Sequence, residues 1–109
     1  MTQVTMSREG TRHTVTAKGH AKGRPDTCAG ISTLMYSLYV WLINTDSAWN
    51  VSAKLDSGDA EISYETGDPG AENVWEFLLC GFLQLQADAP GAVSIRFSPT
   101  LGEKSDRTA

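Results

Sequence analysis

One histidine and one cysteine stand close together in the chain, and their side chains suit nucleophilic catalysis. The segment "GHAKGRPDTCAG", residues 19–30, holds His20 and Cys28 with only small, charged and helix-breaking residues between them. A cysteine thiolate is a strong nucleophile, and a neighbouring imidazolium favours the thiolate over the thiol. Glycines on both sides of His20 allow the segment to fold back toward Cys28. The segment therefore predicts a Cys–His dyad, with Cys28 as nucleophile and His20 as the proton carrier.

The predicted helix that follows this segment places Cys28 in its first turn. Unpaired amides and the positive end of the helix dipole favour an anion there. We also expect the amide of Cys28 and its neighbours to receive the oxyanion of a tetrahedral intermediate. Asp26 or Thr27 is expected to cap the helix, because a short side-chain oxygen can accept from its unpaired first-turn amides. Ser32, one turn after Cys28, either lines the site or bonds back to the Cys28 carbonyl.

Ordinary structural roles are the alternative for these residues. A cysteine near a helix start is commonly a small buried residue, and a histidine in a polar loop commonly faces water. Too few ligands surround His20 and Cys28 for a tetrahedral zinc site, and we expect neither a metal nor a cofactor. Cys80, within a predicted helix, is expected to be a packing residue, and His13, within a predicted strand, is expected to be structural or exposed.

Hydrophobic periodicity predicts an α+β fold that places His20 and Cys28 between a strand and a helix. The helices are expected from Asp26 or Thr27 to Asn44 and over 72–87, and the strands over 2–8, 11–18, 48–56, 58–65 and 92–98. The order β-β-α-β-β-α-β indicates a mainly antiparallel sheet with both helices on one face. We expect a single domain over residues 1–99 and a polar, frayed tail over residues 100–109.

Alternating and helical spacing also predicts which side chains face the core. The first helix is expected to bury Ile31, Leu34, Met35, Leu38 and Leu42. The second is expected to bury Val74, Phe77, Leu78, Gly81, Phe82 and Leu85. On each of the first four strands, alternating residues are expected to share one face: Val4 and Met6; His13, Val15 and Ala17; Trp49, Val51, Ala53 and Leu55; and Ala60, Ile62 and Tyr64. On the last strand, Val93, Ile95 and Phe97 are expected to face inward. The loop over 66–73 is expected to have Pro69 and Gly70 at its centre.

Composition excludes several kinds of partner. The 109 residues carry a formal net charge of −4 and no run of Lys or Arg, which argues against nucleic acid and anionic membrane surfaces. No apolar stretch reaches the ~20 residues that cross a bilayer. Two cysteines without a secretory signal indicate a cytoplasmic protein with free thiols. Because the first helix is also apolar at Tyr39, Trp41 and Ile43, we expect a homodimer centred on that surface.

The sequence "GHA", a glycine-containing loop and "DTCAGIS" resemble the signature of the Prp family of ribosomal-processing cysteine proteases. The matching positions are Gly19, His20, Ala21, Cys28, Ala29, Ile31 and Ser32. The predicted order of elements resembles the family over nearly the whole chain, and "GFLQLQADAPGAVSIRF" is similar to its C-terminal pattern. The segment between His20 and Cys28 is shorter than in the family, and Asp26 stands two residues before the cysteine where the family's acid stands three before.

The resemblance implies a cytoplasmic, homodimeric cysteine endopeptidase. Such an enzyme removes a short N-terminal extension from a large-subunit ribosomal protein, cutting after an aromatic-rich stretch. Cys28 would be the nucleophile and His20 the general base and acid, with Gly19, Ala21, Ala29 and Ser32 around the site. Asp26 would be the candidate for the family's acid, and it either orients His20 or caps the helix. The alternatives are a Prp-like module that binds its peptide without cutting it, a phage-associated form that binds or processes a virion protein, and a structural oligomer.

Overall fold

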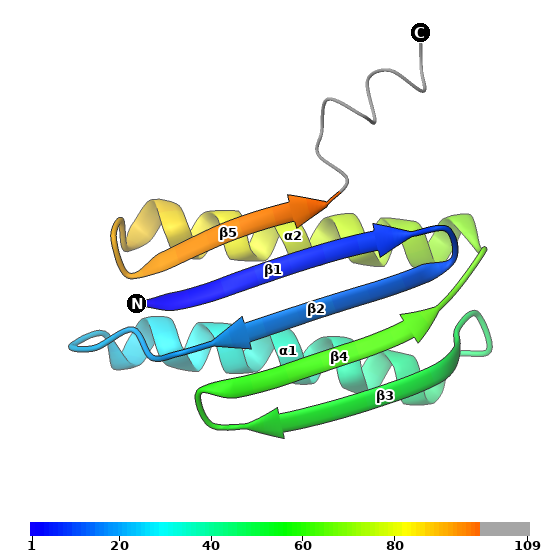
Figure 1. The fold of residues 1–109 in the computed structure, drawn as a ribbon, viewed down its shortest axis with the longest axis horizontal. Coiled ribbons are helices and arrows are strands. Elements are labelled where there is room, and N and C mark those ends of the chain that lie inside the picture. Colours follow the sequence, from blue (N-terminus) through cyan, green and yellow to red (C-terminus); the bar gives the residue numbers. More distant parts are fainter. Residues whose placement is uncertain (99–109) are drawn as a thin grey trace, which may run out of the picture.

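A computed structural model describes residues 1–98 of the chain, which form one five-stranded sheet and two helices. The order along the chain is β-β-α-β-β-α-β, as predicted (Figure 1). The elements are β1 (Thr2–Glu9), β2 (Arg12–Lys18), α1 (Pro25–Asn44), β3 (Trp49–Asp56), β4 (Asp59–Glu65), α2 (Pro69–Asp88) and β5 (Val93–Ser98). The predicted polar tail, residues 100–109, lies outside the described residues.

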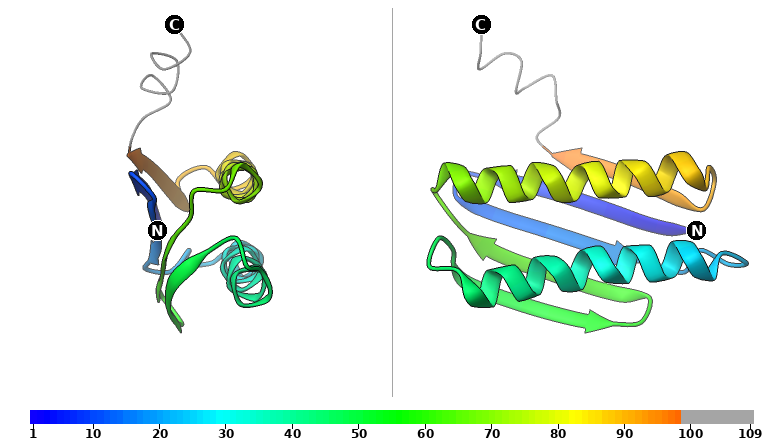
Figure 2. Two further views of the ribbon diagram at one scale, coloured as in Figure 1. Left: turned by 90° about the vertical axis from the view of Figure 1, so that its right-hand side faces the viewer. Right: turned by 180° about the vertical axis from the view of Figure 1, so that it is seen from behind.

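The strands lie side by side in the order β3-β4-β2-β1-β5. Three neighbouring pairs are antiparallel, and only β1 and β5 run parallel, so the sheet is mixed but mainly antiparallel. Seen edge-on, both helices cover the same face of the sheet (Figure 2). This two-layer arrangement gives each helix one face to bury and leaves the other sheet face to polar side chains.

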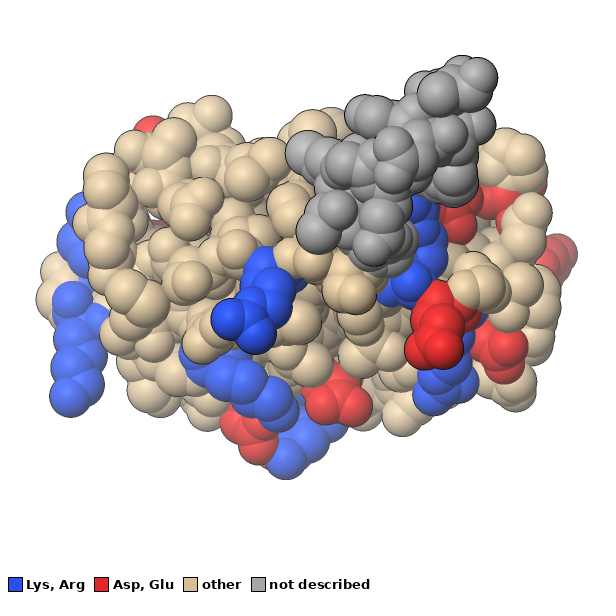
Figure 3. Space-filling model, turned by 45° about the horizontal axis from the view of Figure 1, so that its top comes forward, with Lys and Arg blue, Asp and Glu red and all other residues tan. Residues whose placement is uncertain are grey.

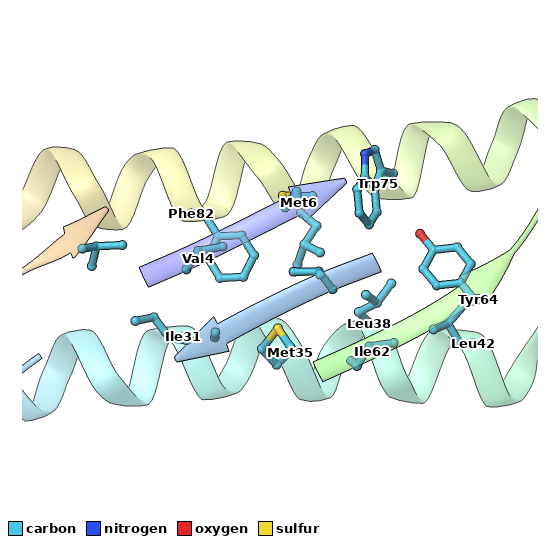
Figure 4. Close-up of a cluster of buried hydrophobic side chains, with 14 residues drawn as sticks. Val4, Met6, Ile31, Met35, Leu38, Leu42, Ile62, Tyr64, Trp75 and Phe82 are labelled. Carbon is cyan, nitrogen blue, oxygen red and sulfur yellow. The ribbon is translucent and has the colours of Figure 1, made fainter. Parts of the chain in front are cut away.

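The hydrophobic core fills the space between the sheet and the helices. Alternate residues of the strands point inward, so Val4, Val15 and Ile62 are fully buried from three neighbouring strands. The stripe of α1 matches the predicted one, with Leu34 half-buried and its other members buried (Figure 4). The core therefore holds β2 and α1 in a fixed relation, and the segment that joins them carries His20.

The two helices approach each other through two reciprocal contacts. A methyl group on Gly30 of α1 would lie 2.7 Å from Leu85 of α2, and one on Gly81 of α2 would lie 2.7 Å from Leu34 of α1. Each glycine thus makes room for a leucine of the opposite helix, and this allows close packing.

Both helices begin earlier than the sequence pattern predicts. The helix starts are Pro25 and Pro69, each preceded by an N-cap residue, Arg24 or Asp68, that makes no side-chain capping hydrogen bond. Proline fits the first helical position because its fixed φ suits a helix and its missing N–H would be unpaired there anyway. The placement of Pro69 inside a loop, and of the first cap at Asp26 or Thr27, was therefore wrong.

Of the apolar residues predicted to share one side of β3, three are exposed and only Leu55 is half-buried. Asn50 has a φ of 53°, and the register with β4 shifts between Trp49 and Ser52. A shift of one residue turns a side chain to the opposite face, so Trp49 lies opposite Glu65 and is exposed. Because β3 is also an edge strand, Val51 and Ala53 are exposed as well.

The predicted stripe of α2 was wrong at one bulky residue. Phe77 is 78% exposed, whereas Trp75 is 6% exposed and belongs to the core. Both residues are compatible with an amphipathic pattern, and the packing of α2 against the sheet selects the stripe that contains Trp75, Leu78 and Phe82.

His13 has a structural role at the end of the sheet where β2 begins. Its ring is fully buried, and its Nδ1 donates to the carbonyl of Thr11 at 2.8 Å. Nε2 lies 2.6 Å from a carboxylate oxygen of Glu72, whose other oxygen accepts a hydrogen bond from Arg8 at 2.6 Å. Both ring nitrogens are thus partnered, and the network joins β1 and β2 to α2.

Candidate active site

The segment that carries His20 lies at the same end of the molecule as the turn between β3 and β4 (Figure 1). Gly19 fixes the start of this segment: its N–H donates to the carbonyl of Gly58 at 2.9 Å, and its own carbonyl accepts from the Thr2 hydroxyl at 3.3 Å. Gly19 has a φ of 89°, and a methyl group on it would lie 2.6 Å from the carbonyl oxygen of Met1. Only glycine suits this position. The two hydrogen bonds fix the backbone of Gly19, directly before His20.

A pocket of about 210 Å³ opens between α1 and the β3–β4 turn, and both His20 and Cys28 line it. Buried side chains from the sheet and the helix contribute to its wall, among them Ala17, Ile31 and Met35. The exposed lining residues include the polar residues Ser32, Asp56 and Ser57. The pocket therefore combines an apolar interior with a thiol and an imidazole.

Cys28 is half-buried in the first turn of α1. Its Sγ donates a weak hydrogen bond to the carbonyl of Ala21 at 3.8 Å. Its amide donates to the carbonyl of Arg24 at 3.1 Å, which closes the first turn of the helix. This amide is consequently not free to bind an oxyanion, and the expectation that it would do so was wrong in this conformation.

His20 is exposed, and its imidazole lies against the β3–β4 turn. Among the hydrogen bonds formed within residues 1–98, none joins this ring to the Cys28 thiol. The two side chains thus share a pocket without a direct bond, an arrangement common in catalytic sites without substrate.

Asp26 lies at the second position of α1 and points into solvent, with its side chain 72% exposed. Its carboxylate pairs with Arg24 at 3.3 Å, and this hydrogen bond, helped by one from the Thr27 amide, lowers the pKa of Asp26. Asp26 is not among the residues that line the pocket. In this conformation it is a partner of Arg24.

The other predicted site residues divide into two groups. Gly19 and Ser32 line the pocket with His20 and Cys28. Ala21 is buried, and its carbonyl accepts the hydrogen bond from the Cys28 thiol. Ala29 is exposed on α1, and its carbonyl accepts a hydrogen bond from the Thr33 hydroxyl.

Sequence reasoning missed the contribution of the β3–β4 turn to the pocket wall. Leu55, Asp56, Ser57 and Gly58 all line it, together with Tyr36 of α1. The turn itself was recognisable from Ser57-Gly58, but its distance from His20 depends on the pairing of β2 with β4. No local signal reports that pairing.

Charges near this end of the sheet are paired across strands. Asp59 accepts from Lys18 of β2 and from Lys54 of β3, so it joins three strands on the outer sheet face. Figure 3 shows positive and negative side chains interspersed over the face it displays. Within residues 1–98 no three His, Cys, Asp or Glu side chains are grouped as metal ligands would be, and no helix is long and apolar enough to cross a bilayer.

Solved structures of known proteins share this arrangement of strands and helices. The ribosomal processing protease Prp of S. aureus, solved with a covalently linked product peptide, superposes with a TM-score of 0.71 at 16% sequence identity, covering 90% of this chain and 100% of the other. The same protease with a substrate peptide gives a TM-score of 0.71 at 15% identity over the same shares. The chain has the Prp fold.

A third solved structure is also similar to this chain. The protein SMU.848 of Streptococcus mutans superposes with a TM-score of 0.70 at 25% identity, covering 89% of this chain and 96% of the other. No protein-family model matches the chain, and no curated protein sequence matches it. The similarity to Prp is thus one of fold, and a shared fold does not by itself imply a shared function.

Proposed function

We propose that the chain is a cysteine endopeptidase in which Cys28 and His20 form the catalytic dyad. The observation that carries the proposal is that a cysteine in the first turn of α1 and a histidine from the preceding segment line one pocket. The fold adds support, because solved Prp structures with this fold hold a product peptide and a substrate peptide.

The proposed reaction proceeds through a thioester. His20 takes the proton of the Cys28 thiol, and Sγ attacks the carbonyl carbon of the scissile peptide bond. As the C–N bond breaks, His20 returns the proton to the leaving amine. Water then attacks the thioester while His20 removes its proton, which releases the carboxylic acid and restores the thiol. In the structure the His20 ring rests against Gly58 in the wall of the pocket that also holds Cys28, and proton transfer starts from this position.

The proposed substrate is the N-terminal extension of a large-subunit ribosomal protein. The apolar pocket wall suits an apolar side chain of such a peptide next to the scissile bond. In line with the resemblance, we propose a cytoplasmic homodimer, with Asp26 as a residue that approaches His20 only when the segment 19–24 rearranges.

A second function, peptide binding without cleavage, is favoured by one specific observation. The thiol donates to the Ala21 carbonyl and has no hydrogen bond to His20. If the short segment between His20 and Cys28 prevents their contact, the pocket would hold a ribosomal or virion peptide but leave it intact.

Cleavage of a synthetic peptide separates the two functions. We expect a fluorophore–quencher peptide with an aromatic-rich ribosomal extension to be cut, and Cys28→Ala to reduce kcat by roughly 10³-fold or more. Cys80→Ala is the matched control, because Cys80 is exposed on α2 and lies outside the pocket. Saturable binding without product would favour the binding function, and equal cleavage by the Cys28→Ala protein would refute the dyad.

A further inference from the structure

Gly58, at the turn between β3 and β4, lies directly against the imidazole of His20. A methyl group built on Gly58 would stand 2.4 Å from Nε2, 2.7 Å from Cε1 and 3.1 Å from Cδ2 of His20. Non-bonded atoms attract at about 3.5–4.0 Å and repel strongly at such short distances. The ring can keep its present position only if residue 58 has no side chain.

The backbone of Gly58 also holds the chain next to His20. Its carbonyl accepts the N–H of Gly19 at 2.9 Å, so the turn and the histidine segment are joined one residue before the ring. Gly58 has a φ of +72°, a conformation that glycine adopts without strain. One residue thus anchors the start of the segment and leaves the space that the ring occupies.

We propose that Gly58 is a positioning residue for His20 and keeps the imidazole at the wall of the Cys28 pocket. The inference rests on the proposed function, because Gly58 acts only through the catalytic histidine. The inference gives the β3–β4 turn a role in catalysis. The sequence of this turn is that of an ordinary hairpin and does not indicate such a role.

An added side chain at Gly58 is expected to move the ring and to leave the fold in place. His20 is exposed, and its ring is the far end of a rotatable side chain. We therefore expect the His20 side chain to change its rotamer while the backbone stays in place. The remaining cost is backbone strain at a positive φ, and this cost is not special to Gly58. Gly10, at the β1–β2 turn, has a φ of +61°, and a methyl group on it would meet nothing within 4 Å.

Gly58→Ala and Gly10→Ala therefore form a matched pair that differs in the collision with His20. The readout is the rate at which iodoacetamide labels Cys28 between pH 5 and 9, followed by mass spectrometry with Cys80 as the internal reference. We expect Gly58→Ala to slow Cys28 labelling at pH 7 about tenfold, toward the few per cent of thiolate in an isolated cysteine. Gly10→Ala should leave the rate within about twofold of the unmodified chain, by the usual independence of distant sites.

Peptide cleavage gives a second readout of the same pair. A displacement of about 1 Å in a catalytic group can cost roughly 10²-fold in rate. We expect that loss in kcat for Gly58→Ala, with equal urea midpoints for the two alanine variants. Gly58→Asn and Gly10→Asn provide a second pair, because asparagine tolerates positive φ yet still places a Cβ against the ring.

A double substitution with His20→Ala distinguishes failure of the positioning role from failure of the dyad. In the His20→Ala background, Gly58→Ala should change Cys28 labelling no more than Gly10→Ala does. Continued slowing in that background would overturn the positioning role. If His20→Ala alone slows labelling but Gly58→Ala behaves like Gly10→Ala, the positioning role is wrong and the dyad stands. If His20→Ala alone leaves both labelling and cleavage unchanged, both proposals are wrong.

Discussion

Single charged side chains fix local geometry on the outer sheet face, close to the candidate site. Asp59 accepts hydrogen bonds from Lys18 and from Lys54, the latter at 2.6 Å. These bonds lower the pKa of Asp59 from its ordinary 3.8 to about 2. Because Asp59 begins β4, directly after the turn that contains Gly58, the two lysines also restrain the strand that follows the turn.

Asp59 should contribute to stability only where it is ionised in the folded chain. A lowered pKa in the folded state means that the contribution is present above about pH 4 and is lost as the pH falls through about 2. We compare the urea midpoints of the unmodified chain and of Asp59→Asn. The difference between them should be constant from pH 7 to 4 and should fall to zero between pH 4 and 2. Added salt should shrink it, because the three side chains are 41–55% exposed. A difference independent of pH would contradict this account.

The face that a helix buries depends on how the helix packs against the sheet, as well as on its own hydrophobic pattern. Phe77 and Phe82 stand on the same helix, yet Phe82 is fully buried and Phe77 is 78% exposed. The prediction placed both in the buried stripe. The structure rotates α2 so that Trp75 replaces Phe77 in the core, next to the stacked rings of His13 and Tyr64.

Phe82→Ala and Phe77→Ala should therefore differ strongly in stability. Loss of a fully buried phenylalanine removes transfer free energy and leaves a cavity, and it is expected to lower the free energy of unfolding by about 3–5 kcal/mol. Phe77→Ala should change it by less than about 0.5 kcal/mol, as is usual for surface positions. Urea unfolding followed by circular dichroism measures both. Equal losses would mean that α2 is rotated relative to the arrangement described above.

At the scale of the whole molecule, the outward face of α1 leaves apolar surface uncovered. Tyr36, Val40 and Ile43 are 51%, 52% and 58% exposed. Tyr39 and Trp41, which the sequence analysis placed at the centre of a dimer, are half-buried and pack against the core. A homodimer through α1 would therefore be centred on Val40, not on Trp41.

Val40→Glu is the substitution that tests this dimer. We expect the unmodified chain to sediment as a dimer at micromolar concentration and the Val40→Glu chain to sediment as a monomer, because a buried unpaired carboxylate opposes association. Ala87→Glu adds the same charge at an exposed position of α2 and should leave the dimer intact. If the unmodified chain is a monomer, or if both variants remain dimers, the interface on α1 is wrong.

Local features of the sequence were sufficient to predict the elements and their order. They also placed a cysteine at the start of a helix and a histidine in the segment before it, and both residues line one pocket. Alternation in β2 and the helical spacing in α1 report burial directly, because each face of these elements meets a single environment. Tertiary structure alone decided the rotation of α2, the exposure of β3 and the turn that adjoins His20. Gly58 and His20 are far apart in the chain and meet because β4 pairs with β2, a long-range contact that no short stretch of residues encodes.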